Sequence, residues 1–175
     1  AFTWSPDGRA IAFVAADSTS REDDAKRGRR DDPQQFEGDV TLTHAWVVDV
    51  ATKKARELTH STDWTVAGAP QWSPDGTRLA FLSGHDPVRD AAEVKPPKHE
   101  PGRVVTRPEF RMNNEGFIDW EHLDHLWVVT VDGGTPRPLT RGTRFKESAL
   151  AWARDGRHLL FVTDRREDLL AAINR

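Results

Sequence analysis

Short apolar runs bounded by turn-forming residues recur along the chain, and three of them follow a tryptophan by a few positions. Each run is too short for a helix and carries Ile, Leu, Phe or Val, so it predicts a β-strand buried on both faces. The residues between the tryptophan and the run favour a type I turn, with Pro at the second position and Gly at the fourth. The copies are W-S-P-D-G at 4–8 before the run 11–14, W-S-P-D-G at 72–76 before 79–82, and the weaker W-A-R-D-G at 152–156 before 159–162.

A second pattern repeats between these motifs. Residues 44–50 (H-A-W-V-V-D-V) recur 81 positions later as 125–131 (H-L-W-V-V-T-V), and R-E-L-T at 56–59 recurs as R-P-L-T at 137–140. Both segments predict strands. The glycines of D-G-G-T at 132–135 predict a tight hairpin between them, whereas the corresponding residues 51–54 lack glycine.

One period of about eighty residues therefore predicts four antiparallel strands, which is a blade of a β-propeller. The predicted class is all-β, with about two blades in residues 1–175. Blade material is expected at 1–16, 44–83 and 125–163. Because an ordinary blade takes roughly 40 to 50 residues, the excess forms inserts at 17–43 and 84–124, where function is expected to concentrate.

Repeating positions are expected to serve the blades rather than a ligand. Aromatic residues that recur in one register pack between blades, so the five repeating tryptophans are assigned to the core and not to a stacking platform for bases or sugars. Trp64 and Trp120 fall outside the register and are better candidates for a ligand role. The structural positions are Trp4, Trp72, Trp152, Trp46, Trp127, Asp7, Gly8, Asp75, Gly76, Asp155 and Gly156.

Composition narrows the function classes. The 25 basic and 28 acidic residues give a formal net charge of −3, and residues 18–35 mix both signs, which indicates a solvated loop rather than a nucleic-acid surface. The apolar runs are far shorter than the roughly 18 to 20 residues that cross a bilayer, so no membrane partner is expected. The absence of cysteine fits a reducing compartment, and we expect a cytoplasmic location.

No pattern of a hydrolase centre, phosphate loop or dinucleotide site occurs, so we expect no catalytic residue and no cofactor in this chain. Glu121, His122 and His125 have spacing that would suit zinc on a helix. However, His125 repeats His44 at the start of a predicted strand, so we expect no metal there. Instead, both histidines are expected to hydrogen-bond backbone groups between a loop and a strand end.

The second insert contains the candidate gating residues. Residues 96–102 read as an extended connector, and M-N-N-E-G at 112–116 favours the turn of an extra hairpin. Arg107, Glu109 and Arg111 alternate, so they would project to one side of a strand and could hold a peptide terminus or carboxylate. The alternative is the solvent-facing side of a hairpin.

The repeated W-S-P-D-G motif, the H-L-W-V-V-T-V-D-G-G segment and the closing P-L-T together resemble the N-terminal propeller of the prolyl oligopeptidase family of serine peptidases. The stretch from V-V-T-R at 104–107 to E-G-F at 115–117 is similar to the acylaminoacyl-peptidase (acyl-peptide hydrolase) branch. TolB-type propellers share the W-S-P-D-G element, so a protein-binding propeller without catalytic activity is the alternative.

The resemblance implies a propeller of about seven blades that admits short peptides to an α/β-hydrolase domain, and a homo-oligomeric parent protein. That hydrolase domain is absent from this sequence, so the resemblance places no triad residue here. A propeller needs at least four blades to close, and we expect the chain to be part of a longer polypeptide. A self-assembling ring of several copies is a third hypothesis.

Overall fold

The computed structural model describes residues 1–16, 28, 42–60, 65–85, 111–112, 116–117, 122–163 and 165, which form twelve strands. The first sheet has the order β1-β2-β3-β4 and the second has the order β10-β9-β6-β5; β11-β12 forms the third sheet, and β7-β8 forms a separate small hairpin. Every pairing is antiparallel. The strands are β1 (Phe2–Trp4), β2 (Ala10–Ala16), β3 (Thr43–Asp49), β4 (Ala55–Glu57), β5 (Val66–Trp72), β6 (Arg78–Ser83), β7 (Arg111–Met112), β8 (Gly116–Phe117), β9 (His125–Thr130), β10 (Arg137–Pro138), β11 (Glu147–Trp152) and β12 (Leu159–Thr163).

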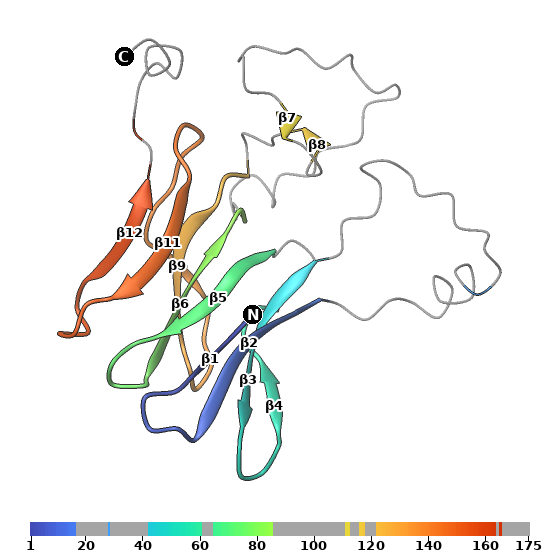
Figure 1. Ribbon diagram of the computed structural model, residues 1–175, viewed down its shortest axis with the longest axis vertical. Coiled ribbons are helices and arrows are strands. Elements are labelled where there is room, and N and C mark those ends of the chain that lie inside the picture. The colour runs from blue at the N-terminus through green and yellow to red at the C-terminus, as the bar shows by residue number, and fades with distance from the viewer. Residues whose placement is uncertain are drawn as a thin grey trace.

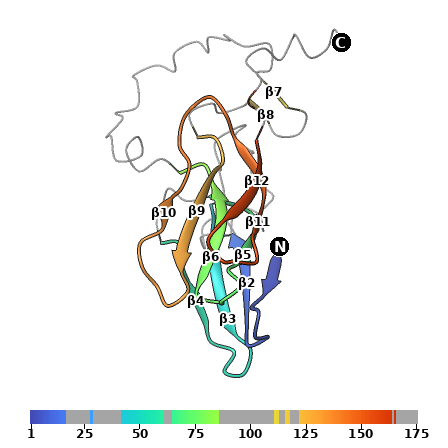
Figure 2. The same ribbon diagram turned by 90° about the vertical axis from the view of Figure 1, so that its left-hand side faces the viewer.

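The two four-stranded sheets are successive propeller blades, which confirms the predicted all-β class. In both, the four strands follow chain order from one edge of the sheet to the other, and the second and third strands are separated by the predicted inserts. Figures 1 and 2 show the first, second and third sheets stacked side by side. The hairpin β7-β8 falls in the second insert, at the position predicted from the M-N-N-E-G segment.

The three D-G turns share one construction. The amides of Gly8, Gly76 and Gly156 each donate to the carbonyl oxygen three residues before, at 2.9, 2.8 and 3.0 Å. These glycines have φ between +64° and +71°, a region that residues with a Cβ rarely adopt. In the first two turns a serine hydroxyl donates to the following aspartate at 2.6 Å, so the serine and aspartate of the motif lock the turn together.

The turns between the third and fourth strands of the two sheets differ in conformation, as the sequence predicts. Gly133 and Gly134 have φ of +109° and +137° in the connection between β9 and β10. The connection between β3 and β4 instead places Lys53 at φ +59°. The Asp49 carboxylate stabilises this turn in the absence of glycine, because it accepts hydrogen bonds from the Thr52 amide and hydroxyl, each at 2.7 Å.

The core lies between the first and second sheets. Ladder partners share a face, so the registers place Ala12 and Val47 on one face of the first sheet, opposite the Leu79 and Phe81 side of the second sheet. Alternate residues of β6, such as Ala80, turn to the other face of the second sheet, and Leu79, Ala80 and Phe81 are all fully buried. The central cluster is Ala12, Ala45, Val47, Leu58, Val66, Leu79, Phe81, Trp127 and Val129.

The stack ends in two apolar faces that no described residue covers. The head face is the outer face of the first sheet and carries Phe2, Trp4, Ile11, Phe13, Trp46 and Val48, which are placed there by the ladder register. The tail face is the outer face of the third sheet, where Leu160 and Val162 are 64% and 60% exposed.

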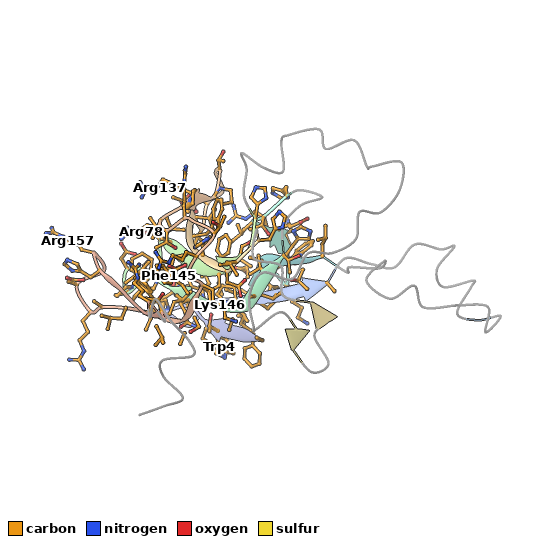
Figure 3. All side chains as sticks on the ribbon, turned by 90° about the horizontal axis from the view of Figure 1, so that it is seen from above. Trp4, Arg78, Arg137, Phe145, Lys146 and Arg157 are labelled. Carbon is orange, nitrogen blue, oxygen red and sulfur yellow. The ribbon has the colours of Figure 1, made fainter. Side chains whose placement is uncertain are left out.

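The assignment of all five repeating tryptophans to the core therefore needs correction. Trp127 is buried, and Trp72 and Trp152 are half-buried between sheets. Trp4 is 53% exposed on the head face, and Figure 3 places it at the periphery of the packed side chains. Trp46 lies half-buried on the same face, stacked on Phe13 at 6.4 Å between ring centroids. The physical reason is that the pleat places Trp4 and Trp46 on the face of the first sheet that points away from the second, and no described sheet packs on that face. For the same reason Ile11 and Phe13 are only half-buried, although their run was predicted to be buried on both faces.

Candidate functional site

Both long inserts leave the blades at the same end of the stack. The first insert connects Ala16 to Thr43, which are ladder partners, and the second connects the partners Ser83 and His125. The D-G turns align at the opposite end, where Pro6 approaches Gly76 and Pro74 approaches Gly156. We call the end defined by these four strand termini the insert rim, and it is the candidate functional site.

A buried ion pair joins the second and third sheets at the insert rim. His125 begins β9 and Glu147 begins β11; the Nδ1 atom of His125 lies 2.6 Å from Oε2 of Glu147, and the two side chains are 10% and 3% exposed. The Nε2 atom of His125 lies 2.7 Å from the carbonyl oxygen of Gly142. An oxygen atom therefore lies within hydrogen-bond distance of each ring nitrogen of His125.

Thr140 completes this cluster. Its hydroxyl donates to Glu147 at 3.1 Å and accepts from the Leu126 amide at 2.9 Å. The Glu147 amide in turn donates to the carbonyl oxygen of Asp124 at 2.9 Å. Burial raises the pKa of Asp124 above its ordinary value, although the charges of Lys146 and His125 oppose the shift. The rim is thus fixed between two sheets by a connected network of polar contacts.

The first sheet repeats half of this arrangement. His44 has the same position in the first sheet as His125 in the second. Its Nδ1 atom lies 3.3 Å from the Thr59 hydroxyl, which accepts a hydrogen bond from the Ala45 amide at 3.0 Å. The Thr43 hydroxyl donates to the carbonyl oxygen of Val66 at 2.9 Å and so connects the first sheet to the second. No carboxylate repeats Glu147, because Val66, the ladder partner of Ser83, occupies the position that Glu147, the partner of Thr163, has in the third sheet.

The base of the second insert is closely packed. A Cβ atom added to Gly84 would overlap the carbonyl oxygen of His122, so only glycine fits between the two chain segments. The next residue, His85, places its ring 5.6 Å from the ring of Trp127. These contacts hold the two ends of the insert together immediately beside the blade.

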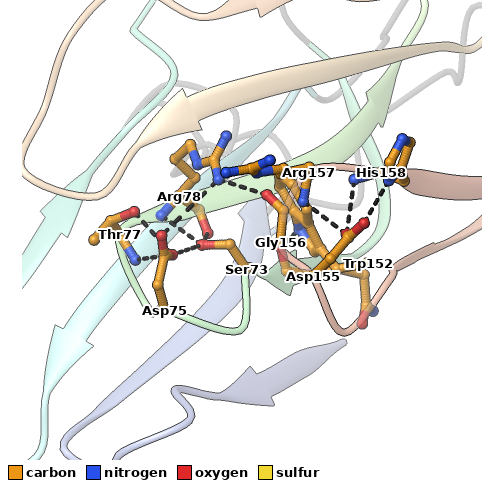
Figure 4. A network of polar contacts seen from close by, with 10 residues as sticks. Ser73, Asp75, Thr77, Arg78, Trp152, Asp155, Gly156, Arg157 and His158 are labelled. Carbon is orange, nitrogen blue, oxygen red and sulfur yellow. Dashed lines mark hydrogen bonds and ion pairs between the residues drawn. The ribbon is translucent and has the colours of Figure 1, made fainter.

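The opposite end carries a second polar network, shown in Figure 4, that again connects two sheets. Arg78 donates from Nη2 to the carbonyl oxygen of Gly156 at 2.7 Å, and its guanidinium lies 4.9 Å from the centre of the Trp152 ring. Hydrogen bonds from the Ser73 hydroxyl and from the Thr77 amide and hydroxyl lower the pKa of Asp75 to about 2. All of these contacts lie within or between turns, so this network has a structural role.

Tryptophan indoles also connect the sheets. The Nε1 atom of Trp72 donates to the carbonyl oxygen of Thr3 at 3.2 Å, and Nε1 of Trp152 donates to that of Gln71 at 3.0 Å. In each case the acceptor immediately precedes the repeating tryptophan of the previous sheet. The same hydrogen bond, from an indole to the carbonyl before the preceding tryptophan, is therefore made at both sheet interfaces.

The predicted gating residues are only partly placed. Arg107 and Glu109 lie outside the described residues, as do Trp64, Trp120 and residues 18–27 and 29–35. Arg111 lies in β7, paired with Phe117, but its side chain is not among those described. Whether the three side chains share one face stays a prediction.

The expected hydrogen bonding of the two rim histidines is confirmed for His125, which contacts the Gly142 carbonyl, whereas His44 contacts a threonine hydroxyl. Glu147 was not predicted, and its only sequence signal is an acidic residue at the start of a strand in place of Val66. No group of three metal-ligating side chains occurs among the residues that the structure describes. Within that same part of the chain, no helix is long and apolar enough to cross a membrane.

Comparison with known proteins supports the fold but no particular family or function. No protein-family model and no curated protein matches the sequence. A solved structure described as TolB from Agrobacterium tumefaciens superimposes with a TM-score of 0.51 at 17% identity, covering 95% of this chain and 38% of that one. The β-propeller domain of the trilobed protease from Pyrococcus furiosus gives a TM-score of 0.44 at 14% identity over 88% of this chain and 30% of that one.

An acylaminoacyl peptidase bound to a chloromethyl ketone gives a TM-score of 0.43 at 18% identity, covering 85% of this chain and 18% of the peptidase. The chain thus spans well under half the length of each of these structures. The matches are distant and include both TolB and peptidase propellers, so they identify propeller blades without favouring either function.

Proposed function

We propose that this chain is part of the substrate-gating propeller of a serine peptidase of the prolyl oligopeptidase family, in its acylaminoacyl-peptidase branch. The observation that carries the proposal is the shared position of the two long inserts, which both leave the blades at the insert rim. The family resemblance of the second insert, stated above from the sequence, supplies the choice of a peptidase.

The rim suits a gate because its base is rigid. The pair between His125 and Glu147 joins two sheets, and Gly84 packs directly on the His122 carbonyl. A gate needs such a support, since a substrate-selecting group must be held by a fixed scaffold. Arg107 and Arg111 would supply cations for a peptide carboxylate, and Glu109 would supply an anion for a peptide amine.

The chemistry itself would come from an α/β-hydrolase domain of the parent chain. In this proposal the propeller excludes folded proteins and admits short peptides, from which the peptidase releases an acylated or free N-terminal residue. The parent would be a cytoplasmic homo-oligomer. The blades contribute selection by size and end-group charge, and no covalent step.

The test uses the complete product of the gene that encodes this chain. A serine-directed fluorophosphonate should label that product, and it should hydrolyse short N-acylated peptides but not a folded protein containing the same N-terminal segment. The isolated 175-residue chain should show neither reaction. A complete product that is neither labelled nor active would overturn the peptidase proposal and favour a TolB-like binding propeller.

A second measurement tests the gate separately. Replacing Arg107 and Arg111 with Ala should raise KM for a peptide with a free carboxylate while leaving hydrolysis of a small uncharged ester unchanged. Lys98→Ala is the matched control, because Lys98 is a cation of the same insert that lies in the connector 96–102, before the alternating positions. An equal effect of the control would contradict the assignment of these positions to the gate.

A further inference from the structure

The loop between β10 and β11 carries a cluster of positive charge at the insert rim. We call its residues 141–146 (R-G-T-R-F-K) the rim loop, and its three cations, Arg141, Arg144 and Lys146, are all exposed. The rim loop connects the second sheet to the third, both of which the structure describes. It therefore lies at a junction inside the stack and not on either end face.

The internal repeat shows that this charge is not part of the scaffold. The rim loop repeats residues 60–65 (H-S-T-D-W-T) at the offset of 81, and both loops follow a threonine and have an aromatic residue at the fifth position. These recurring positions are the ones that a connection between two sheets requires. The three cations do not recur, since they stand in place of His60, Asp63 and Thr65.

Buried contacts hold the rim loop in place. Thr140 immediately precedes it and Glu147 immediately follows it, and the Thr140 hydroxyl donates to the Glu147 carboxylate at 3.1 Å. Within the loop, the Gly142 carbonyl oxygen lies 2.7 Å from Nε2 of His125. A loop that is fixed at three points loses less conformational entropy when it binds a ligand.

Phe145 holds a guanidinium group at the surface of the loop. Its ring is half-buried, and the guanidinium carbon of Arg144 lies 5.2 Å from the ring centre, within the range of a cation–π contact. Figure 3 labels Phe145 next to Lys146. Arg165 also lies over this ring, at 5.7 Å, but it is not counted with the loop cations because Asp164 precedes it in the sequence.

The described carboxylates nearby do not cancel the charge of the rim loop. Glu147 is 3% exposed and contacts His125 and Thr140. Asp124 is half-buried, and its charge interacts with that of Lys146. Within the described part of the chain, neither Arg141 nor Lys146 forms an ion pair. The three exposed cations therefore face one partly buried carboxylate.

The number and chemistry of these cations fit a short acidic peptide segment. Guanidinium groups bind carboxylates through paired N–H groups, and an ammonium group adds a further donor. A nucleic acid would instead need cations along many phosphates, and the formal net charge of −3 opposes such an extended polyanion.

We propose that the rim loop binds a peptide segment with clustered Asp or Glu side chains, which Arg141, Arg144 and Lys146 hold through charge-assisted hydrogen bonds. The segment binds at the rim from which both inserts leave the blades. This proposal adds a binding partner to the rim and does not depend on the peptidase assignment.

The test measures fluorescence anisotropy of a short labelled peptide with consecutive glutamates, titrated with the complete product of the gene that encodes this chain. The peptide should bind at low ionic strength and bind more weakly as salt is added, because salt screens exposed charges. A matched peptide with glutamine at each glutamate should not bind. Arg141→Ala combined with Lys146→Ala should weaken binding of the glutamate peptide about fivefold to tenfold.

Two further variants separate the loop from general charge. Arg154→Ala combined with Arg157→Ala is the matched control, because it removes two exposed cations from the D-G turn at the opposite end and should leave the affinity unchanged. Arg141→Lys combined with Lys146→Arg keeps both charges and should preserve binding to within about twofold. Circular dichroism checks that each variant keeps its β structure.

Four results would overturn the proposal. The first is no binding of the glutamate peptide at low ionic strength. The second is an equal loss of affinity in the loop variant and the control, which would indicate general charge attraction. The third is an equal loss in the charge-preserving variant. The fourth is tighter binding of a single-stranded oligonucleotide that the loop variant abolishes, which would assign the loop to nucleic acid.

Discussion

The guanidinium of Arg78 donates to the Gly156 carbonyl at 2.7 Å and lies 4.9 Å from the centre of the Trp152 ring, so one side chain joins two consecutive sheets. Its contact with the turn of the next sheet resembles that of Arg56, which donates from Nη2 to the Val131 carbonyl across the preceding interface. Arginine thus fixes neighbouring sheets at two points where the core itself ends.

Arg78→Ala should lower the free energy of unfolding by about 1–2 kcal/mol, because a charged hydrogen bond and a partly exposed cation–π contact are both lost. Urea denaturation at one fixed protein concentration measures the change. Arg9→Ala is the control. The Arg9 side chain is 85% exposed and its one ion pair, with Asp7, is long at 3.9 Å, so its loss should change stability by less than about 0.5 kcal/mol. Equal losses for both variants would contradict a role of Arg78 between the sheets.

Glu147→Ala should be the most destabilising rim substitution, costing about 3–5 kcal/mol, because it leaves the His125 ring buried without its carboxylate. Glu147→Gln should cost less, since the amide oxygen still accepts a hydrogen bond. Glu57→Ala is the comparison beside the repeated histidine, His44: the Glu57 side chain is 26% exposed and lies 3.7 Å from His44, and about 1 kcal/mol or less is expected. Thermal denaturation of the three variants ranks them, and a smaller effect at Glu147 than at Glu57 would be inconsistent with a buried pair.

Gly84→Ala should destabilise the chain by about 2 kcal/mol or more, since the new methyl group would overlap a backbone oxygen that has little freedom to move. Gly28→Ala adds the same group where nothing lies within 4 Å, and no loss is expected. Native-state hydrogen exchange at β6 and β9 would locate the effect. Unchanged protection of both strands in Gly84→Ala would refute the close packing at the base of the insert.

The Asp75 carboxylate should titrate at about pH 2, because the Ser73 hydroxyl and the Thr77 amide and hydroxyl all donate to its charged form. The folded-state pKa lies below the ordinary value of 3.8, so the unfolded chain binds the proton more tightly. The stabilisation is therefore complete above the unfolded value and is lost as the pH falls from there through about 2. A carbon-13 NMR titration of the carboxyl group measures the midpoint directly.

Ser73→Ala should move that midpoint upward, since it removes the largest cause of the shift. Asp75→Asn should reduce the acid sensitivity of folding in the same pH window. A midpoint near the ordinary value in the unsubstituted chain would show that these hydrogen bonds do not form in solution.

Local chemistry was sufficient to predict the strands and turns. The W-S-P-D-G motif predicts a reversal because Pro, Asp and Gly restrict the same four residues in every copy. The repeat of H-x-W-V-V likewise predicts which strands are equivalent. The fold class followed because four such strands per period bury both faces only when sheets stack.

The features that the sequence did not predict depend on neighbours in space. Trp4 and Trp72 are identical in local sequence, yet Trp4 is exposed because no described sheet lies before the first one. Glu147 pairs with His125 across a sheet boundary, and nothing within either segment specifies that contact. Ala149, at φ +45°, lies in a bulge of β11. The only hint of this bulge in the sequence is Gly68, which lies in the corresponding bulge of β5.

Because both inserts are attached at paired strand termini, their length and sequence can change without altering the sheets. Ala16 pairs with Thr43, and Ser83 with His125, whatever the length of chain between them. Doubling a flexible connection costs only about 0.6 kcal/mol of closure entropy. Selection can therefore lengthen, shorten or exchange these segments almost freely, and a new binding specificity can be grafted onto an unchanged scaffold at this one rim.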